Sequence, residues 1–183
     1  MYAGHFAAGL VIKSKVPRAP TWVLMTGVGL LDILFGPFVL LGLERVTLTP
    51  GVPPGFSLDY IDWSHSLLMS LVWAVLFGAL FLRRGRTVAV AAAIAVFSHF
   101  LLDVFMHPAD LALWPNASVH VGFGLWKILP VGWWFVELGF IGVCFVYYYQ
   151  RSRVVSTFGQ RAWAVLAVIV FLHVVNSPWL MPK

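Results

Sequence analysis

Residues 87–106 read TVAVAAAIAVFSHFLLDVFM, a run of twenty residues in which the ionisable side chains are His99 and Asp103. A membrane-spanning helix needs about 20 mainly apolar residues, so this stretch predicts a transmembrane helix. His99 and Asp103 are four residues apart, which places both on one face of that helix. The stretch therefore predicts that the chain lies in a membrane and that His99 and Asp103 belong to a candidate site there.

Other apolar stretches extend this prediction to the whole chain. Residues 20–43, 63–82 and 131–150 are long enough to span a bilayer, and 161–177 is slightly short. Residues 1–12 are apolar but would cover only about 18 Å as a helix, enough to enter the membrane but not to cross it. Gly36-Pro37 is expected to kink or end the first long helix. We expect an all-α fold: one domain over residues 1–183, a polytopic transmembrane helix bundle of about five spans plus a short N-terminal apolar helix.

The composition excludes most other classes of protein. Of the 183 residues, 61% are hydrophobic and 10% are charged, whereas a soluble domain carries about 25% charged residues. The net charge of +5 does not indicate a nucleic-acid partner, because the basic residues form short clusters between apolar runs, as topology signals do. The single cysteine, Cys144, lies in an apolar run and excludes a disulfide framework or a Cys-based zinc site.

The same basic clusters predict the orientation in the membrane. An odd number of spans would place nine basic residues on one side, which the positive-inside rule makes cytoplasmic. They are Lys13, Lys15, Arg18, Arg83, Arg84, Arg86, Arg151, Arg153 and Arg161. Loops 44–62 and 107–130 would then be external. The expected location is a bacterial inner membrane, with the chain in contact with membrane lipids.

Ionisable residues inside the predicted spans define the candidate site, because such groups are costly in a bilayer and by default mark function. At 1.5 Å per residue, we expect Asp103, Glu137, His99 and Asp32 to lie about 5–15 Å below the external surface. His65 lies near the external end of its own span. Imidazole and carboxylate groups that agree in depth suit zinc, and also manganese or iron. The predicted metal ligands are His5, Asp32, His65, His99 and Asp103.

Each of these residues also has a structural interpretation. His5 lies near a terminus and could be a surface residue, and Asp32, with no Lys or Arg at its depth, could be protonated. His65 could be an interfacial residue behind a helix start in which Asp62 or Ser64 is the N-cap. His99 and Asp103 could be a hydrogen-bonded pair that ties helices together. His173 is interpreted as a packing or loop contact, and His120 and Asp110 as surface polarity.

The motifs together resemble a known family. The chain contains Gly4-His5, Leu31-Asp32, Ser64-His65-Ser66-Leu67, Ser98-His99 with Leu102-Asp103, and Leu113-Trp114-Pro115. In order and spacing, over roughly residues 1–116, these elements resemble the YdjM-like family of bacterial inner-membrane proteins, usually described as metal-dependent hydrolases. The chain departs from the family at Asp32-Ile33-Leu34, where relatives often carry a second carboxylate.

The leading hypothesis is a membrane-embedded metal-dependent hydrolase that acts on a lipid or phosphoester-type substrate near the external leaflet. The five ligands would hold one or two divalent ions, with zinc as the first choice. Glu137 would act as general base, or would orient a metal ligand without binding the metal itself. Two rivals stay open. One is a non-catalytic accessory subunit of a larger membrane protein complex, and the other is a membrane protein that binds haem through two histidines.

Overall fold

The structure, a computed structural model, is mostly helical and describes residues 2–49, 56–152, 158–177 and 179–180. Two short antiparallel hairpins accompany the helices, β1 Arg45–Leu48 with β2 Phe56–Tyr60, and β3 Leu111–Ala112 with β4 His120–Val121. The helices are α1 Tyr2–Lys15, α2 Thr21–Val28, α3 Leu30–Leu40, α4 Asp62–His65, α5 Leu67–Ala79, η1 Leu82–Arg84, α6 Arg86–Met106, α7 Leu125–Ile128, α8 Gly132–Ser152 and α9 Phe158–Val175.

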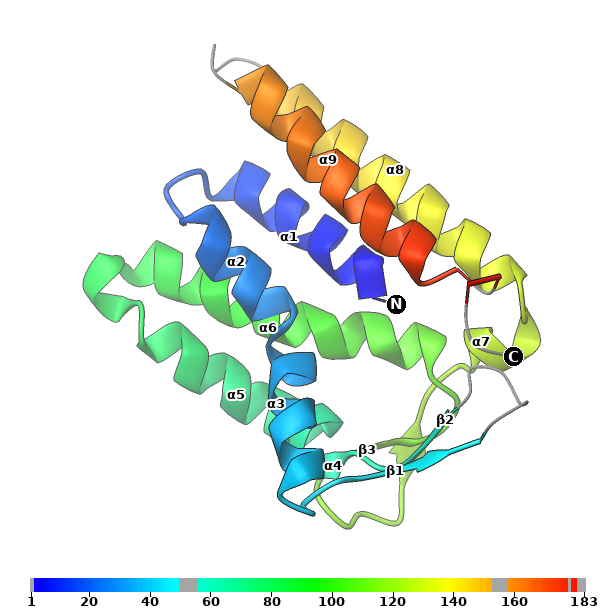
Figure 1. Cartoon of the computed structure of the whole chain (residues 1–183). Helices are drawn as coiled ribbons and strands as arrows, with labels where there is room; N and C mark the ends of the chain where they lie inside the picture. The colour runs from blue at the N-terminus through cyan, green and yellow to red at the C-terminus, as the bar shows by residue number, and fades with distance from the viewer. Residues whose placement is uncertain (1, 50–55, 153–157, 178, 181–183) are drawn as a thin grey trace.

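Helix α1 is the central element of the molecule. It lies between the α2 and α6 helices on one side and the α8–α9 pair on the other, and it contacts all four (Figure 1). Its buried face consists mainly of small residues, including Ala3, Gly4, Ala7 and Gly9, which allow neighbouring helices to approach closely. A short apolar helix was expected here, but its central position was not.

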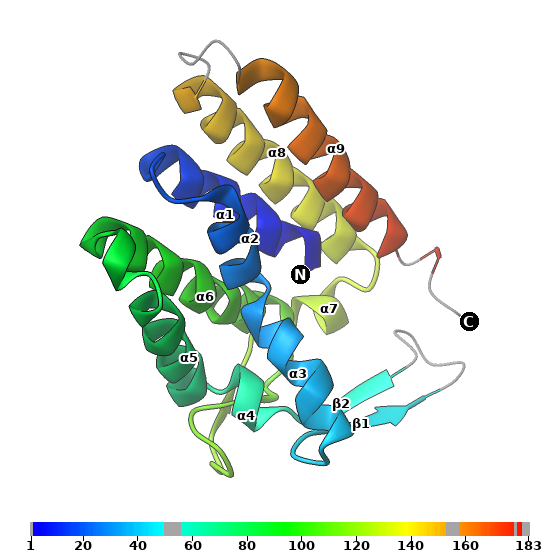
Figure 2. The same cartoon turned by 60° about the vertical axis from the view of Figure 1, so that its left-hand side comes forward.

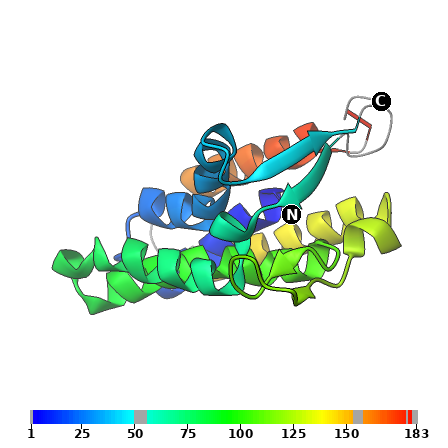
Figure 3. The same cartoon turned by 90° about the horizontal axis from the view of Figure 1, so that it is seen from below.

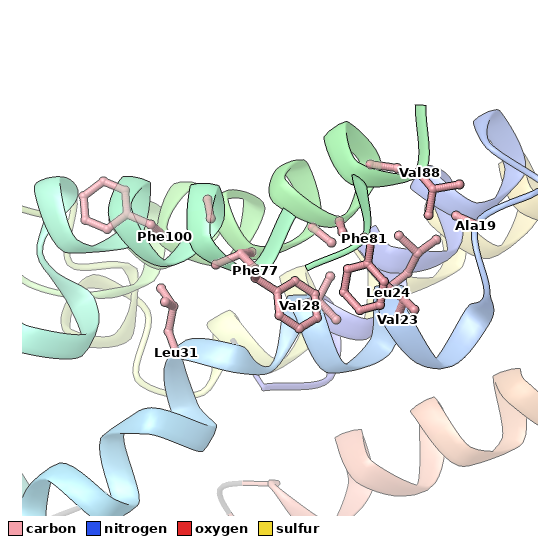
Figure 4. Close-up of a cluster of buried hydrophobic side chains, with 14 of the residues drawn as sticks. Ala19, Val23, Leu24, Val28, Leu31, Phe77, Phe81, Val88 and Phe100 are labelled. Carbon is pink, nitrogen blue, oxygen red and sulfur yellow. The ribbon is translucent and has the colours of Figure 1, made fainter. Parts of the chain in front are cut away.

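The α2, α5 and α6 helices share the larger hydrophobic core. Figure 4 shows Phe77 and Phe81 of the α5 region against Val28 and Leu24 of α2. Gly78 allows the close approach of α5 to α6, since a Cβ atom there would lie 2.8 Å from the carbonyl oxygen of Ala89. Small residues at helix crossings are typical of packing in membranes.

The first long apolar stretch bends earlier than predicted. Helices α2 and α3 meet at Gly29 at an angle of 50°, whereas Pro37 lies inside α3, which continues to Leu40. The helix therefore does not end at Gly36-Pro37. Gly27 and Gly29, which flank Val28, were the overlooked signal, because glycine is a poor helix former.

The stretch 63–82 is likewise not one helix. It begins as the single turn α4, breaks at Ser66, and continues as α5, whose first turn is capped by Ser66 Oγ accepting from the Met69 N–H. Ser66, and not Asp62 or Ser64, is thus the N-cap of the longer helix, and His65 is buried. Figure 2 shows α4 between α5 and the β1–β2 hairpin.

The all-α prediction is confirmed, whereas the prediction of about five membrane spans is not. Within the described residues, α6 is the one helix both long and apolar enough to cross a bilayer, and the bent α2–α3 pair adds a second if it forms one span. Helix α8 has 21 residues but carries Trp133, Trp134 and three consecutive tyrosines. Viewed from below, the helices form a shallow stack, with α5 and α6 on one side and α3 and the β1–β2 hairpin on the other (Figure 3).

Candidate metal centre

Helix α6 supplies the buried centre of the site. His99 and Asp103 have 1% and 2% of their surface exposed, and His99 Nε2 lies 3.0 Å from Asp103 Oδ2. The i, i+4 spacing of the sequence therefore places both groups on one face, as predicted. This pair is the point on which three other segments converge.

The central helix brings His5 to the same pair. His5 Nε2 lies 3.2 Å from Asp103 Oδ1, and the His5 and His99 rings stack with centroids 3.7 Å apart and planes within 4°. His5 is in the first turns of α1, which packs against α6. An early histidine in an apolar run is thus a site residue.

Asp32 and His65 complete the cluster. His65 Nε2 lies 3.5 Å from Asp32 Oδ1 and 3.9 Å from Asp103 Oδ2. His99 Nε2 lies 3.7 Å from Asp32 Oδ1. All five predicted ligands, which come from α1, α3, α4 and α6, therefore meet at one place.

The cluster has one accessible side. The side chains of His5, His65, His99 and Asp103 are at most 7% exposed, whereas that of Asp32 is 40% exposed. Asp32 sits in the first turn of α3, directly after the bend at Gly29. Water or substrate would reach the cluster from this side.

The donor atoms fit a divalent ion. There are two sets of ligand atoms, and within each set the atoms lie within 4.8 Å of one another. The first set comes from His5, His99 and Asp103, and the second from Asp32, His65 and His99. Tetrahedral zinc with bonds of about 2.0–2.1 Å places its ligands roughly 3.4 Å apart. The contacts above, from 3.0 to 3.9 Å, bracket that spacing.

The bend at Gly29 fixes the orientation of His99. His99 Nδ1–H donates to the Val28 carbonyl oxygen at 2.7 Å, a group that the end of α2 leaves available. The remaining nitrogen, Nε2, then presents its lone pair to the two aspartates. Metal-binding histidines are usually held in this way by an acceptor on the far nitrogen.

A second chain of hydrogen bonds orients His65. Its Nδ1 lies 2.6 Å from Ser64 Oγ, and that hydroxyl donates to the buried carboxylate of Glu44 at 2.8–2.9 Å. Glu44 also accepts from the Ser64 N–H at 2.7 Å. Burial raises the pKa of Glu44, and its hydrogen bonds from Ser64 oppose that shift. Glu44 was not predicted to belong to the site, because it lies in a loop 20 residues before its partner Ser64.

His107 lies one further turn along the same face. Its Nε2 is 4.0 Å from Asp103 Oδ1, and its Nδ1 is 3.1 Å from Asp110 Oδ1. The ring also lies against Trp126, with centroids 4.4 Å apart. Asp110 was expected to be only an exposed polar residue, but it has a specific partner in His107. His120, in contrast, is exposed on β4.

Glu137 lies in a different place from the five ligands. Its Oε1 accepts from the Gly4 N–H at 2.8 Å, and its Oε2 lies 3.1 Å from His173 Nδ1. Neither set of candidate ligands contains it. Because its partners, Gly4 and His173, are not among the five ligands, its position supports neither the general-base role nor the orienting role. His173, expected to be a packing contact, is its buried partner.

The basic residues gather at the opposite end of α6. Lys15, Arg18 and Arg84 line one surface hollow of about 340 Å³ at the turns between α1 and α2 and before α6. Arg86 begins α6, and Asp103 lies about 26 Å further along its axis. The site and the basic end are thus separated by nearly the thickness of a bilayer core.

Comparison of the sequence with family models and with curated proteins, and of the fold with solved structures, finds no match. The fold and the site together define a helical protein with a buried histidine–aspartate cluster.

Proposed function

We propose that this chain is an integral membrane protein of a bacterial inner membrane that hydrolyses a lipid or phosphoester-type substrate with the help of a divalent metal, zinc in the first instance. The observation that carries the proposal is the meeting of the five predicted ligands in one cluster, with Asp32 exposed on one side. A closed shell would indicate a structural ion, whereas a catalytic one needs a free position.

The surface of the molecule supports the membrane part of this proposal. Large apolar side chains are exposed along the outer faces of α5, α6, α8 and α9, among them Val75, Leu80, Phe105, Val143 and Phe171 at 56–74%. Many exposed large apolar side chains are typical of a surface that faces a membrane or a protein partner. Because these faces belong to helices spread over the whole chain, a surrounding bilayer accounts for them better than one docking partner.

The depth of the site supports a lipid substrate. If the basic end is cytoplasmic, a cluster about 26 Å along α6 lies near the external interface, where ester and phosphoester groups of lipids reside. The metal would supply an acidified water and a positive charge for the developing oxyanion. The five predicted ligands would hold one or two such ions, with Asp32 on the accessible side.

The two rivals have less support. A haem between two histidines needs one imidazole on each face of the macrocycle. The His5 and His99 rings are stacked directly on each other, with Asp103 next to both, and leave no space for a haem between them. An accessory subunit would need no open coordination position. The exposure of Asp32 favours a catalytic centre.

A vesicle assay tests the activity. The purified chain, reconstituted in phospholipid vesicles, should release a phospho-headgroup or fatty acid, lose this activity with a chelator, and regain it with zinc. The His99→Ala variant should be inactive, and His120→Ala, a matched change at an exposed histidine, should retain activity. Metal binding without turnover on any lipid ester or phosphoester would favour the accessory-subunit alternative.

A topology experiment tests the orientation separately. A reporter fused after Arg86 should read as cytoplasmic, and one inserted at Phe123, in the loop between β4 and α7, as external. The reverse result would place the site on the cytoplasmic side and remove the argument for an external-leaflet substrate.

A further inference from the structure

Four imidazoles surround the carboxylate of Asp103, two near each of its oxygens. Its Oδ2 lies 3.0 Å from His99 Nε2 and 3.9 Å from His65 Nε2. Its Oδ1 lies 3.2 Å from His5 Nε2 and 4.0 Å from His107 Nε2. A carboxylate that faces a separate pair of imidazoles with each oxygen has the arrangement of a bridge between two cations.

The stacking of His5 on His99 shows why one cation does not suffice. An imidazole binds a metal through a lone pair in the plane of its ring, and these two planes are parallel within 4° with centroids 3.7 Å apart. An ion between the rings would lie about half that spacing outside each plane, nearly the whole length of a bond of about 2.0–2.1 Å. The ligand atoms of His5, His99 and Asp103 are close enough for one ion, but the ring planes exclude it.

Two ions, each in the plane of its own ring, would be separated by about the ring spacing. That spacing agrees with the roughly 3.5–4 Å between the ions of two-metal enzymes. It also agrees with the span of a carboxylate that donates one oxygen to each ion.

The far nitrogens of the imidazoles support the assignment of His107. In His99, His65 and His107, Nδ1 is held by the Val28 carbonyl, Ser64 and Asp110, respectively. His107 thus has the same support as the two other histidines, and its ring is 95% buried. A surface histidine would need neither the orienting carboxylate nor Trp126 against its face.

We propose that the site is a two-ion centre bridged by Asp103, with Asp32, His65 and His99 around one ion and His5 and His107 around the other. This inference rests on the metal binding proposed above and sharpens the substrate class. Two ions at this spacing suit in-line displacement at phosphorus, which favours a phosphoester over a carboxylic ester. In that hydrolysis a water oxygen forms the new bond to phosphorus, the P–O bond to the alcohol breaks, and the proton of water passes to the leaving alcohol.

The metal content of the full chain tests the proposal. The detergent-purified protein is stripped with a chelator, loaded with zinc, desalted and measured for zinc per chain. We expect two ions in the wild type and in His120→Ala, one in His107→Ala, and none or one in His5→Ala. Loading with Mn²⁺ gives a second readout, because a bridged pair produces a spin-coupled resonance spectrum that His107→Ala should convert to that of an isolated ion.

The outcomes separate this proposal from the proposed function. One zinc per wild-type chain, unchanged in His107→Ala, would overturn the two-ion centre and leave a one-ion hydrolase standing. No retained metal in the wild type would overturn both. If His107→Ala unfolds in circular dichroism, Asp110→Asn is used instead, and an uncoupled manganese spectrum in the folded wild type would still reject the bridge.

Discussion

Two buried histidine–carboxylate groups lie on opposite sides of α1, and they differ in what they leave available. Around Asp103, several imidazole nitrogens converge on two carboxylates, and Asp32 is 40% exposed. Around Glu137, one imidazole and one N–H meet one carboxylate, and the Trp134 ring covers His173 at 4.3 Å. The Asp103 group offers several ligand atoms to one point and is exposed to the surface at Asp32. The Glu137 group links α1, α8 and α9 by hydrogen bonds, and its acid and histidine are buried.

The difference teaches that depth and residue type alone do not identify a metal site. Glu137 and Asp103 are both fully buried acids near a histidine, and the sequence grouped them together. What separates them is the number of lone pairs aimed at one point and the acceptors that hold the far nitrogens. Binding should therefore respond to mutations around Asp103 and not to those around Glu137.

Removal of a central ligand should have the largest effect on metal affinity. A structural zinc site contributes about 10–16 kcal/mol from about four ligands, so His99→Ala should lower affinity on the order of 10²-fold or more. Competition with a chromophoric chelator measures the change. Asp103→Asn should be at least as severe, and Asp59→Asn on the exposed face of β2 is the matched control with unchanged affinity. Equal affinities for His99→Ala and the wild type would break the comparison.

Loss of an orienting group should have an intermediate effect. Ser64→Ala removes the hydroxyl that links His65 to Glu44, and changes of this kind typically cost 10–100-fold in metal affinity. The buried Glu44 then also loses a hydrogen-bond donor. Ser14→Ala, at a serine bonded only within α1, serves as the control in the same chelator titration. An affinity of Ser64→Ala within twofold of the wild type would show that His65 needs no such support.

Changes at the closed pair should have the smallest effect on metal and a clear effect on stability. Glu137→Ala leaves the Gly4 N–H and His173 unpaired, and an unpaired buried group costs about 1–3 kcal/mol. Glu137→Gln retains an acceptor for Gly4 and should cost less. We expect a lower midpoint in thermal unfolding but a metal affinity within about threefold of the wild type. A loss as large as that of His99→Ala would place Glu137 in the centre after all.

The part of the site predictable from sequence depended on local geometry and on depth. His99 and Asp103 share a helix, so their spacing alone predicts a common face. Asp32 and His65 come from separate helices, and their convergence was expected because their estimated depths agree. His5 was expected there as an early histidine in an apolar run and from the family resemblance. Glu44 could not be found in this way, since it acts through Ser64 and its position depends on how the loop after α3 folds back.

The fold was predictable where the chain is uniform and not where it is interrupted. Helices α6 and α8 match the expected stretches 87–106 and 131–150 within two residues at each end. The break at Gly29 was missed because the apolar run continues through it. The turn at Ser66 was missed although the polar residues Ser64, His65 and Ser66 interrupt the apolar pattern there. The strands β1 and β2 were also missed, although Phe56, Leu58 and Tyr60 alternate with polar residues as strands do.

X-ray absorption at the zinc edge on the zinc-loaded, detergent-purified chain tests the central claim most directly, because it reports the atoms bound to the ion. We expect a shell of nitrogen and oxygen at about 2.0–2.1 Å with the outer scattering of imidazole rings, reduced together with the zinc content in His99→Ala and kept in Glu137→Gln. A zinc content no higher than that of His99→Ala, or a shell of water oxygens without imidazole scattering, would contradict the account.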